Sequence, residues 1–251
     1  MSGRRLVVVG ASTGLGRCLG VGLAQRGAQV ALLARTEHLL AEAAKEAGPG
    51  TLAITCDVTD PDSCGRALDD AAAGLGGIDA VVYSAGIGVL RRIGDVDAGT
   101  WAELFATNVT GASLVTAAAL PHLRASDGMI AYLSSVNASL TPPWPGLGAY
   151  AVTKAALDKL VEAWRSEHPE VGFTRVVVGE CAGGEGAAGS QFTASWEPEL
   201  AGEMLETWMA RGLLTDKLMD VGHFVDALDG VLSCKPTVSI PTVALTPRRP
   251  I

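Results

Sequence analysis

The segment YAVTK, residues 150–154, holds a tyrosine and a lysine four positions apart. On a helix these positions lie on one face, so Tyr150 and Lys154 can present a phenol and an ammonium to one small volume. Free tyrosine, with a pKa of about 10, is a poor base at neutral pH, and a nearby cation favours its phenolate. The pair could therefore transfer a proton. The alternative is a tyrosine that packs at a helix start beside a lysine that extends to water.

A glycine-rich segment places Gly10, Gly14 and Gly16 directly after a strand-like run and at the start of a helix. Glycines let backbone N–H groups approach a pyrophosphate, and a helix N-terminus favours its negative charge. Ser12 and Thr13 can add hydroxyl donors. The segment predicts a dinucleotide phosphate site. A tight turn without a ligand is the alternative.

The second strand-like run ends at Ala34-Arg35. In a dinucleotide site, a residue at this place commonly contacts the adenosine ribose. An acidic residue there suits a free 2′-hydroxyl, whereas an arginine suits a 2′-phosphate, and here the arginine is present. A solvated arginine at a helix start is the alternative. Asp57 follows the third run and could meet the adenine edge, or could equally be a turn or cap residue.

Short apolar runs alternate with longer periodic segments along the chain. Several runs are apolar on both faces, as buried parallel strands are. The predicted strands are 5–10, 29–34, 51–56, 78–85, 129–135, 173–178 and 237–245. The predicted helices are roughly 15–27, 36–47, 61–76, 97–123, 148–168, 197–212 and 220–232. This alternation predicts the α/β class, with a doubly wound parallel sheet of about seven strands and helices on both faces.

The composition indicates a folded chain, with 48% hydrophobic and 18% charged residues. A net charge of −8 argues against a general nucleic-acid or anionic-membrane surface. The N-terminus lacks signal-peptide features, and no uninterrupted apolar run reaches transmembrane length. The five cysteines include no C-x-x-C pair and no histidine at metal-ligand spacing. We therefore expect a cytoplasmic protein with reduced thiols and no metal site.

Further short motifs follow the glycine segment in order along the chain. They are Asp57-Val58, Ser84-Ala85-Gly86, Asn108, Ser134-Ser135 and Tyr150-x-x-x-Lys154. With the glycine segment, this series resembles the short-chain dehydrogenase/reductase family from about residue 4 to 178. The resemblance implies a single Rossmann-like domain over residues 1–251, a nicotinamide cofactor and hydride transfer to or from a carbonyl carbon. It also implies that Arg35 marks a preference for NADP.

The resemblance assigns a role to each catalytic candidate. Tyr150 would be the general acid in reduction and the base in oxidation, and Lys154 would lower its pKa and hold the nicotinamide ribose. Ser135 would donate a hydrogen bond to the reacting oxygen, and Asn108 would anchor a water in the proton path. The expected cofactor-binding residues are Gly10, Ser12, Thr13, Gly14, Leu15, Gly16, Arg35, Asp57, Val58, Ser84, Ala85, Gly86, Asn108, Tyr150 and Lys154.

The chain departs from the family pattern in two places. The spacing from Ser135 to Tyr150 is a little longer than usual, which leaves Ser134 and Ser139 as alternatives for the serine role. After the sixth strand, relatives usually carry Pro-Gly, whereas this chain has Cys181-Ala182 in a glycine-rich stretch. Cys181 has no basic residue beside it and is a poor candidate nucleophile. We expect residues of about 179–215 to form a substrate loop or lid.

Two classes of function remain open from the sequence. The first is an NADP(H)-dependent oxidoreductase acting on a small carbonyl or alcohol substrate, and the second is a non-catalytic nucleotide-binding sensor or assembly subunit. The four catalytic candidates together favour the enzyme. Trp144, Trp196 and Trp208 could line an apolar pocket, or could equally serve the core or a subunit contact. The resemblance implies a homotetramer or homodimer, and we expect neither a nucleic-acid nor a membrane partner.

Overall fold

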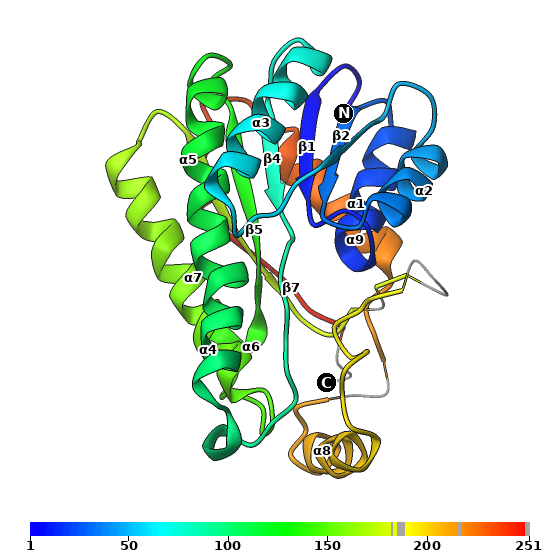
Figure 1. The fold of residues 1–251 in the computed structure, drawn as a ribbon, viewed down its shortest axis with the longest axis vertical. Helices are drawn as coiled ribbons and strands as arrows, with labels where there is room; N and C mark the ends of the chain where they lie inside the picture. Colours follow the sequence, from blue (N-terminus) through cyan, green and yellow to red (C-terminus); the bar gives the residue numbers. More distant parts are fainter. Residues whose placement is uncertain (182, 185–188, 215–216, 249–251) are drawn as a thin grey trace.

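Seven parallel strands form the centre of the computed structural model, which describes residues 1–181, 183–184, 189–214 and 217–248 (Figure 1). The strand order across the sheet is β3-β2-β1-β4-β5-β6-β7. The strands are β1 (Arg5–Val9), β2 (Gln29–Ala34), β3 (Leu52–Thr55), β4 (Ala80–Tyr83), β5 (Met129–Ser135), β6 (Gly172–Val178) and β7 (Thr242–Leu245). The predicted fold class is thus confirmed, and all seven predicted strands are present.

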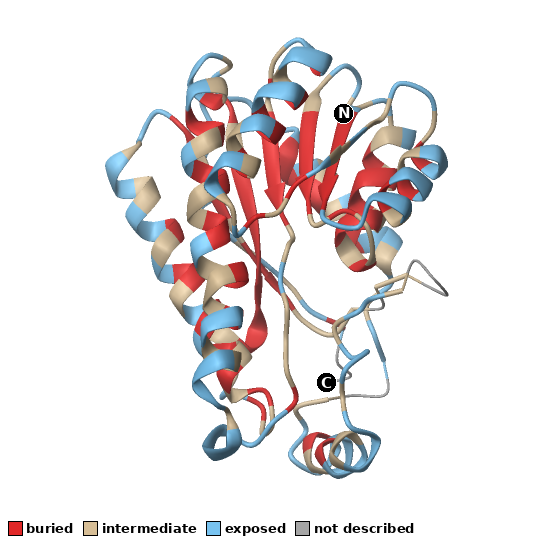
Figure 2. Cartoon of the chain, viewed as in Figure 1, coloured by how far each residue is buried: buried red, intermediate tan, exposed pale blue. Residues whose placement is uncertain are grey.

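Helices cover both faces of the sheet, and each face has its own apolar core. One core joins the sheet to α3, α5 and α7, and the other joins it to α1, α2 and α9. Figure 2 shows the strands and the inward helix faces as the buried part of the chain. The helices are α1 (Gly14–Gln25), α2 (Glu37–Ala47), α3 (Pro61–Leu75), α4 (Ala98–Phe105), α5 (Gly111–Arg124), α6 (Val136–Ser139), α7 (Gly148–Glu167), α8 (Pro198–Ala210) and α9 (Val221–Leu232).

Local chemistry explains where the helices begin and end, as α3 illustrates. The Asp60 carboxylate accepts a hydrogen bond from the backbone N–H of Asp62 at 3.0 Å, which caps the helix start. Pro61 occupies the first turn, where its missing N–H costs nothing. Gly76 ends the helix in the left-handed region at φ 75°. Such short-range signals are why the predicted helix bounds agree closely with the observed ones.

The switch in strand order lies between β1 and β4. From β1 the chain moves outward through β2 to β3, and then crosses to β4 on the other side of β1. Loops leaving two such strands diverge, so a crevice opens at their carboxyl ends, where α/β proteins bind ligands. The glycine segment after β1 and the Ser84–Gly86 segment after β4 both leave the sheet at this crevice.

Two predicted strands were too long, and one of them, expected at 78–85, is observed only as Ala80–Tyr83. The expected strand 237–245 is observed only as Thr242–Leu245, paired with β6 at the sheet edge. Pro241 immediately precedes it and has no N–H to donate to a strand ladder. The preceding Val238 is exposed.

Three short elements escaped the sequence analysis. They are the single-turn helix α6, the 3₁₀ turn η1 (Ile93–Asp95) and the π-helical turn η2 (Ala106–Thr110) between α4 and α5. Turns this short have no hydrophobic periodicity, because one turn offers too few positions to repeat a pattern. Two of the three matter here, since η2 carries Asn108 and α6 begins directly after Ser135.

The helix that runs through α4, η2 and α5, Ala98–Arg124, is long and apolar enough to cross a membrane, with a mean hydropathy of 1.3 over its best window. This differs from the expectation above, which counted only uninterrupted apolar residues, whereas Glu103 and Asn108 interrupt this stretch. Half of that window, 50%, is buried inside the structure. A core helix passes the same test, so this is weak evidence for a membrane span.

Candidate active site

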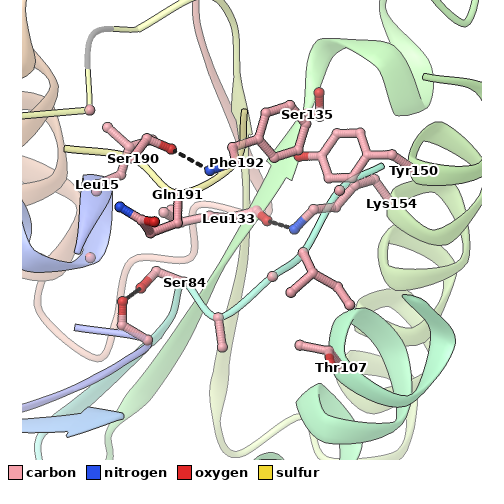
Figure 3. Close-up of a pocket in the computed structure, with 18 of the residues that line it drawn as sticks. Leu15, Ser84, Thr107, Leu133, Ser135, Tyr150, Lys154, Ser190, Gln191 and Phe192 are labelled. Atoms are coloured by element: carbon pink, nitrogen blue, oxygen red, sulfur yellow. Dashed lines mark hydrogen bonds between the residues drawn. The ribbon is translucent and has the colours of Figure 1, made fainter. Parts of the chain in front are cut away.

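A cavity of about 820 Å³ opens at the carboxyl ends of the strands, at the crevice between β1 and β4 (Figure 3). Its walls come from the glycine segment, the ends of β2, β4 and β5, the start of α7 and the segment around α8. Among the predicted site residues, those that line it are Gly10, Ser12, Thr13, Gly14, Leu15, Gly16, Arg35, Val58, Ser84, Ala85, Gly86, Ser135, Tyr150 and Lys154. The tertiary structure therefore gathers residues from 10 to 154 around one space.

The glycine turn leaves no room for side chains at two of its positions. A Cβ atom on Gly10, which has a φ of 83°, would lie 2.5 Å from the backbone nitrogen of Ala85. A Cβ atom on Gly16 would lie 2.2 Å from the carbonyl oxygen of Gly10. Glycine is thus required for the turn to pack against the segment after β4. Gly14, at φ 59°, begins α1, so the start of this helix faces the cavity.

Arg35 follows β2, is exposed and lines the same cavity as the glycine turn. Asp57 does not line the cavity. Its carboxylate accepts hydrogen bonds from the backbone N–H and the hydroxyl of Thr59, at 2.9 and 2.7 Å. These two bonds hold the pKa of Asp57 below its ordinary value. The structure therefore gives Asp57 the turn role left open above, and an adenine contact stays a prediction.

The segment after β4 closes the floor of the cavity. The Ser84 hydroxyl donates a hydrogen bond to the carbonyl of Val9 at 2.6 Å, which ties the ends of β1 and β4 together. A Cβ atom on Gly86 would lie 3.4 Å from the Lys154 ammonium nitrogen. The absence of a side chain at Gly86 thus leaves the cavity open in front of this lysine.

Lys154 is buried and holds its ammonium close to the phenol of Tyr150. Its Nζ atom lies 5.7 Å from the centre of the Tyr150 ring and donates to the carbonyl of Leu133 at 2.7 Å. Burial lowers the pKa of Lys154 to about 8, against an opposing attraction from the Asp158 carboxylate. At neutral pH this group therefore remains a cation.

Tyr150 stays a neutral phenol in this structure. Burial raises the pKa of Tyr150 to about 12, and the nearby Ser135 hydroxyl opposes this rise. The loss of hydration thus outweighs any help that the neighbouring cation gives to the phenolate. At neutral pH the hydroxyl carries its proton, which is the form that an acid needs.

The three candidate serines have different neighbours. The Ser135 hydroxyl accepts a hydrogen bond from the backbone N–H of Asn137 at 3.3 Å and lines the cavity with Tyr150, near enough to lower the pKa of the phenol. Ser134 and Ser139 instead lie near Asp158, where burial raises the pKa of the carboxyl and both hydroxyls oppose that rise, although the Ser134 hydroxyl has no hydrogen-bond partner. Of the three, Ser135 is therefore the serine beside the phenol. Its oxygen also caps the short helix α6, which lies beside the start of α7.

Asn108 lies behind the cavity wall and is fully buried. Its side-chain amide donates to the Ile87 carbonyl and to the Thr153 hydroxyl, both at 2.9 Å, and accepts from the Ile87 N–H at 2.8 Å. The amide thus clamps the loop after β4 to α7. Isolated π-helical turns such as the one that carries Asn108 are frequent at functional sites. The predicted water-holding role stays a prediction.

The segment before α8 covers part of the cavity with residues that the motifs did not identify. Phe192 packs edge-on against the Tyr150 ring, with 4.9 Å between ring centres. A Cβ atom on Gly88 would lie 2.1 Å from the Phe192 ring, so the two are in close contact. The only sequence signal was the general expectation of a loop at about 179–215. Of that stretch, residues 182, 185–188 and 215 lie outside the described part of the chain.

Neither a nucleophilic thiol nor a metal site is found within the described residues. Cys181 forms an isolated bridge with Met219, and burial raises the pKa of its thiol to about 11, so it is a poor nucleophile at neutral pH. The five cysteines, all within the described ranges, are reduced. No group of three or more metal-ligating side chains occurs in the part of the chain that the structure describes.

This glycine-lined groove, with its serine, tyrosine and lysine, agrees with what sequence comparison finds. The family described as "short chain dehydrogenase" matches residues 4–196. Because the match spans most of the chain, the chain belongs to the short-chain dehydrogenase/reductase family.

Curated relatives carry oxidoreductase names. One is 11-beta-hydroxysteroid dehydrogenase 1A of Arabidopsis thaliana, 37% identical over 170 residues that make up 66% of this chain and 48% of the relative. Another is 11-beta-hydroxysteroid dehydrogenase A of Arachis hypogaea, 35% identical over 185 residues, or 71% of this chain and 52% of the relative. The chain spans about half the length of these relatives.

Solved structures share the fold over almost the whole chain. A short-chain type dehydrogenase/reductase from Mycobacterium ulcerans is 25% identical with a TM-score of 0.82, covering 98% of this chain and 89% of that one. A 3-ketoacyl-(acyl-carrier-protein) reductase from Brucella melitensis, solved with NADH, is 19% identical with a TM-score of 0.81, covering 98% and 97%. An alcohol dehydrogenase from Thermococcus sibiricus, solved with 5-hydroxy-NADP, is 23% identical with a TM-score of 0.78, covering 96% and 95%.

Proposed function

We propose that this protein is an NADP(H)-dependent oxidoreductase that transfers a hydride between nicotinamide and the carbon of a carbonyl or secondary alcohol substrate. One observation carries the proposal. The Tyr150 phenol lines the same cavity as the glycine turn, together with the Ser135 hydroxyl and the buried Lys154 ammonium, which lies 5.7 Å from the centre of the phenol ring. Proton donor, oxygen anchor and cation are thus in one place, next to a crevice of dinucleotide-binding type.

The groove fits a dinucleotide cofactor. At the glycine turn, Gly10 and Gly16 admit no Cβ atom, and the start of α1 presents backbone N–H groups of the kind that bind phosphate. Lys154 would hold the nicotinamide ribose at the other end. When bound, the cofactor supplies the hydride in reduction and accepts it in oxidation.

The chain's own residues would manage the proton. In reduction the substrate oxygen gains negative charge, and the Ser135 hydroxyl would donate a hydrogen bond to it. The Tyr150 hydroxyl would give its proton to that oxygen, and the Lys154 ammonium would stabilise the phenolate that remains. In oxidation the phenolate would take the proton back. Both polar groups of the Asn108 side-chain amide already form hydrogen bonds within the protein. A water in the proton path would therefore bind to the backbone of Asn108.

The preference for NADP(H) rests on Arg35. Its guanidinium follows β2 at the edge of the groove, while the residue before it, Ala34, is apolar and buried. A guanidinium forms charge-assisted bonds with a phosphate, and a free ribose hydroxyl has no acidic partner at Ala34. One structural neighbour was solved with NADH and another with an NADP derivative, so this preference rests on the residue alone.

A panel assay separates the enzyme from a non-catalytic nucleotide-binding subunit. NADPH absorbance would be followed with short aldehydes, linear ketones and ring ketones as substrates. An enzyme oxidises NADPH with at least one class, and the product alcohol accumulates in equal amount. If NADPH binds in a calorimeter but no carbonyl compound accelerates its oxidation, the sensor or assembly role replaces the enzyme.

A further inference from the structure

Beyond Ser135 and Tyr150, the cavity is bounded by an apolar cluster that belongs to neither face of the sheet. We call its cavity-lining members the aromatic wall. They are Trp144, Leu147, Phe192, Trp196, Trp208 and Leu214. They come from the loop before α7, the segment before α8, α8 itself and the residues after it. Figure 1 shows α8 standing away from the sheet, so this cluster does not serve the main cores.

The rings of the wall form a continuous series that starts at the phenol of Tyr150. The Phe192 ring lies 4.9 Å from Tyr150 and 5.5 Å from Trp196, centre to centre. Trp208 continues the series at 5.9 Å from Trp196 and 5.3 Å from Trp144. Figure 3 shows Phe192 and Tyr150 together beside Ser135. A molecule with its oxygen at Ser135 would therefore have the wall next to its carbon skeleton.

Hydrogen bonds fix the orientation of two of the indoles. Trp208 donates its Nε1–H to the carbonyl of Pro145 at 2.9 Å, and Trp144 donates to the Thr141 hydroxyl at 3.3 Å. Both residues are buried. The wall is thus preformed, and a ligand would meet the carbon edges and faces of its rings, because the Trp144 and Trp208 N–H groups already have partners and the Trp196 N–H, which has none, is buried.

The wall offers nothing to a charged ligand. All six members are uncharged. Arg91, which also lines the cavity, pairs with Asp97 at 2.9 Å and is 46% exposed, so its charge sits at the rim. A carboxylate or ammonium moved against the wall would lose its hydration without gaining a partner there.

We infer that the substrate is an uncharged ketone or secondary alcohol whose reacting carbon is attached to a flat ring system that packs on the aromatic wall. This inference rests on the proposed function, because Ser135 and Tyr150 locate the reacting oxygen. A flat ring makes offset and edge contacts with aromatic side chains, whereas a flexible chain loses rotational freedom on binding and makes fewer of them.

Ligand binding can be measured without turnover, because three of the five tryptophans belong to the wall. Acetylnaphthalene, an uncharged two-ring ketone, would be titrated into the protein with and without NADPH while tryptophan fluorescence is recorded and the heat of binding is measured. Comparison ligands are the same ketone bearing a carboxylate on its distal ring and a straight-chain methyl ketone of equal carbon number. We expect the two-ring ketone to bind at least about tenfold more tightly than either one.

Matched variants assign the signal to the wall. Trp196→Leu shortens the wall at a half-buried position, and Trp164→Leu removes an indole from α7 that does not line the cavity. We expect Trp196→Leu to weaken acetylnaphthalene binding by about tenfold or more, as loss of a tryptophan contact commonly does, and Trp164→Leu to leave it unchanged. If circular dichroism shows Trp196→Leu to be misfolded, Phe192→Leu serves in its place with the same expectation.

The results separate this inference from the proposed reaction. If the carboxylated or straight-chain ketone binds as tightly as acetylnaphthalene, if no ketone binds up to its solubility, or if the folded wall variant binds like wild type, the inference is overturned. If acetylnaphthalene binds as expected but neither it nor any other ring ketone oxidises NADPH, the proposed reaction fails while the ring-binding wall stands.

Discussion

At the scale of single residues, burial decides the chemistry of Tyr150 and Lys154. Burial disfavours the charged form of each group, so it raises the pKa of the phenol to about 12 and lowers that of the ammonium to about 8. At neutral pH both keep their protons. The pair is thus prepared to donate a proton and to stabilise the phenolate that results.

Tyr150→Phe tests the acid directly. The change removes one oxygen and little volume, so the protein should fold and bind NADPH as before, because Lys154 and the glycine turn remain. Turnover should fall by roughly 10²–10⁴-fold, the usual contribution of a positioned general acid. Steady-state kinetics and calorimetric titration of NADPH measure the two effects.

The control for this experiment is Tyr132→Phe. The Tyr132 hydroxyl shares a hydrogen bond with the Thr116 hydroxyl at 2.7 Å, away from the cavity. Its loss should lower the melting temperature slightly and leave turnover unchanged. A Tyr150→Phe protein that retains more than about a tenth of wild-type turnover would refute the acid role.

Arg35→Ala tests the cofactor preference at the same scale. Loss of a charge-assisted contact to the 2′-phosphate should weaken NADP(H) binding by about 1.5–3 kcal/mol and affect NAD(H) little. Calorimetric titration of both cofactors measures the difference, with the exposed Arg66→Ala as the control. If Arg35→Ala weakens the binding of both cofactors equally, Arg35 does not contact the 2′-phosphate.

At the scale of elements, α7 carries a polar row from the cavity into the protein. Lys154 is followed one helical turn later by Asp158, which is 5% exposed and contacts the Arg175 guanidinium of β6 at 3.2 Å. The Asp158 carboxylate raises the pKa of Lys154 and so opposes the effect of burial. The helix thus supplies both the cation and a buried anion that helps to keep it charged.

Asp158→Asn should move the alkaline limit of activity. Without the carboxylate, the pKa of Lys154 falls below about 8, so the ammonium is lost at a lower pH. The alkaline limb of the kcat/KM profile should therefore shift to lower pH, while the rate at acidic pH changes less. Asp69→Asn, at an exposed carboxylate of α3, is the control. An unshifted alkaline limb in a folded Asp158→Asn protein would show that Lys154 does not depend on Asp158.

At the scale of the whole molecule, the outer faces of the helices offer apolar side chains for assembly. Val152 lies on α7 between two buried neighbours, and its own side chain is 44% exposed. Such a helix face can pair with a symmetry mate across a two-fold axis. Members of this family commonly oligomerise, so we expect a homodimer or homotetramer.

Light scattering tests this expectation. The mass should be two or four times the 25.7 kDa of one chain at micromolar concentration. Val152→Asp would place a charge in the paired surface and should shift the protein toward the monomer, because an unpaired buried charge is costly. Val238→Asp, at an exposed valine before β7, is the matched control and should leave the mass unchanged. A wild-type monomer, or assembly unaffected by Val152→Asp, would exclude this face.

The sequence alone was enough to predict the long helices, the seven strands and the motif residues. Some patterns act over only a few residues, so they can be recognised in a short stretch of sequence. They include strands that are apolar on both faces, helix periodicity and helix-end residues such as Asp60 and Gly76. The ends of the strands predicted at 78–85 and 237–245 were the exceptions, because strand pairing depends on distant partners. The glycine turn and the Tyr150–Lys154 pair were likewise visible, because their spacing carries their geometry.

Only the tertiary structure decided what surrounds these residues. Burial leaves Tyr150 protonated, and that burial comes from segments far away in sequence, including the segment before α8. The choice of Ser135 over Ser134 and Ser139 follows from which hydroxyl affects the pKa of the phenol and which affect that of Asp158. The contact of Phe192 with Tyr150 had no signature in the sequence, and Trp144, Trp196 and Trp208 were candidates for an apolar pocket whose place beside the phenol only the fold could decide. Packing between distant segments has no local period, so the character of the substrate wall emerges only when the chain is folded.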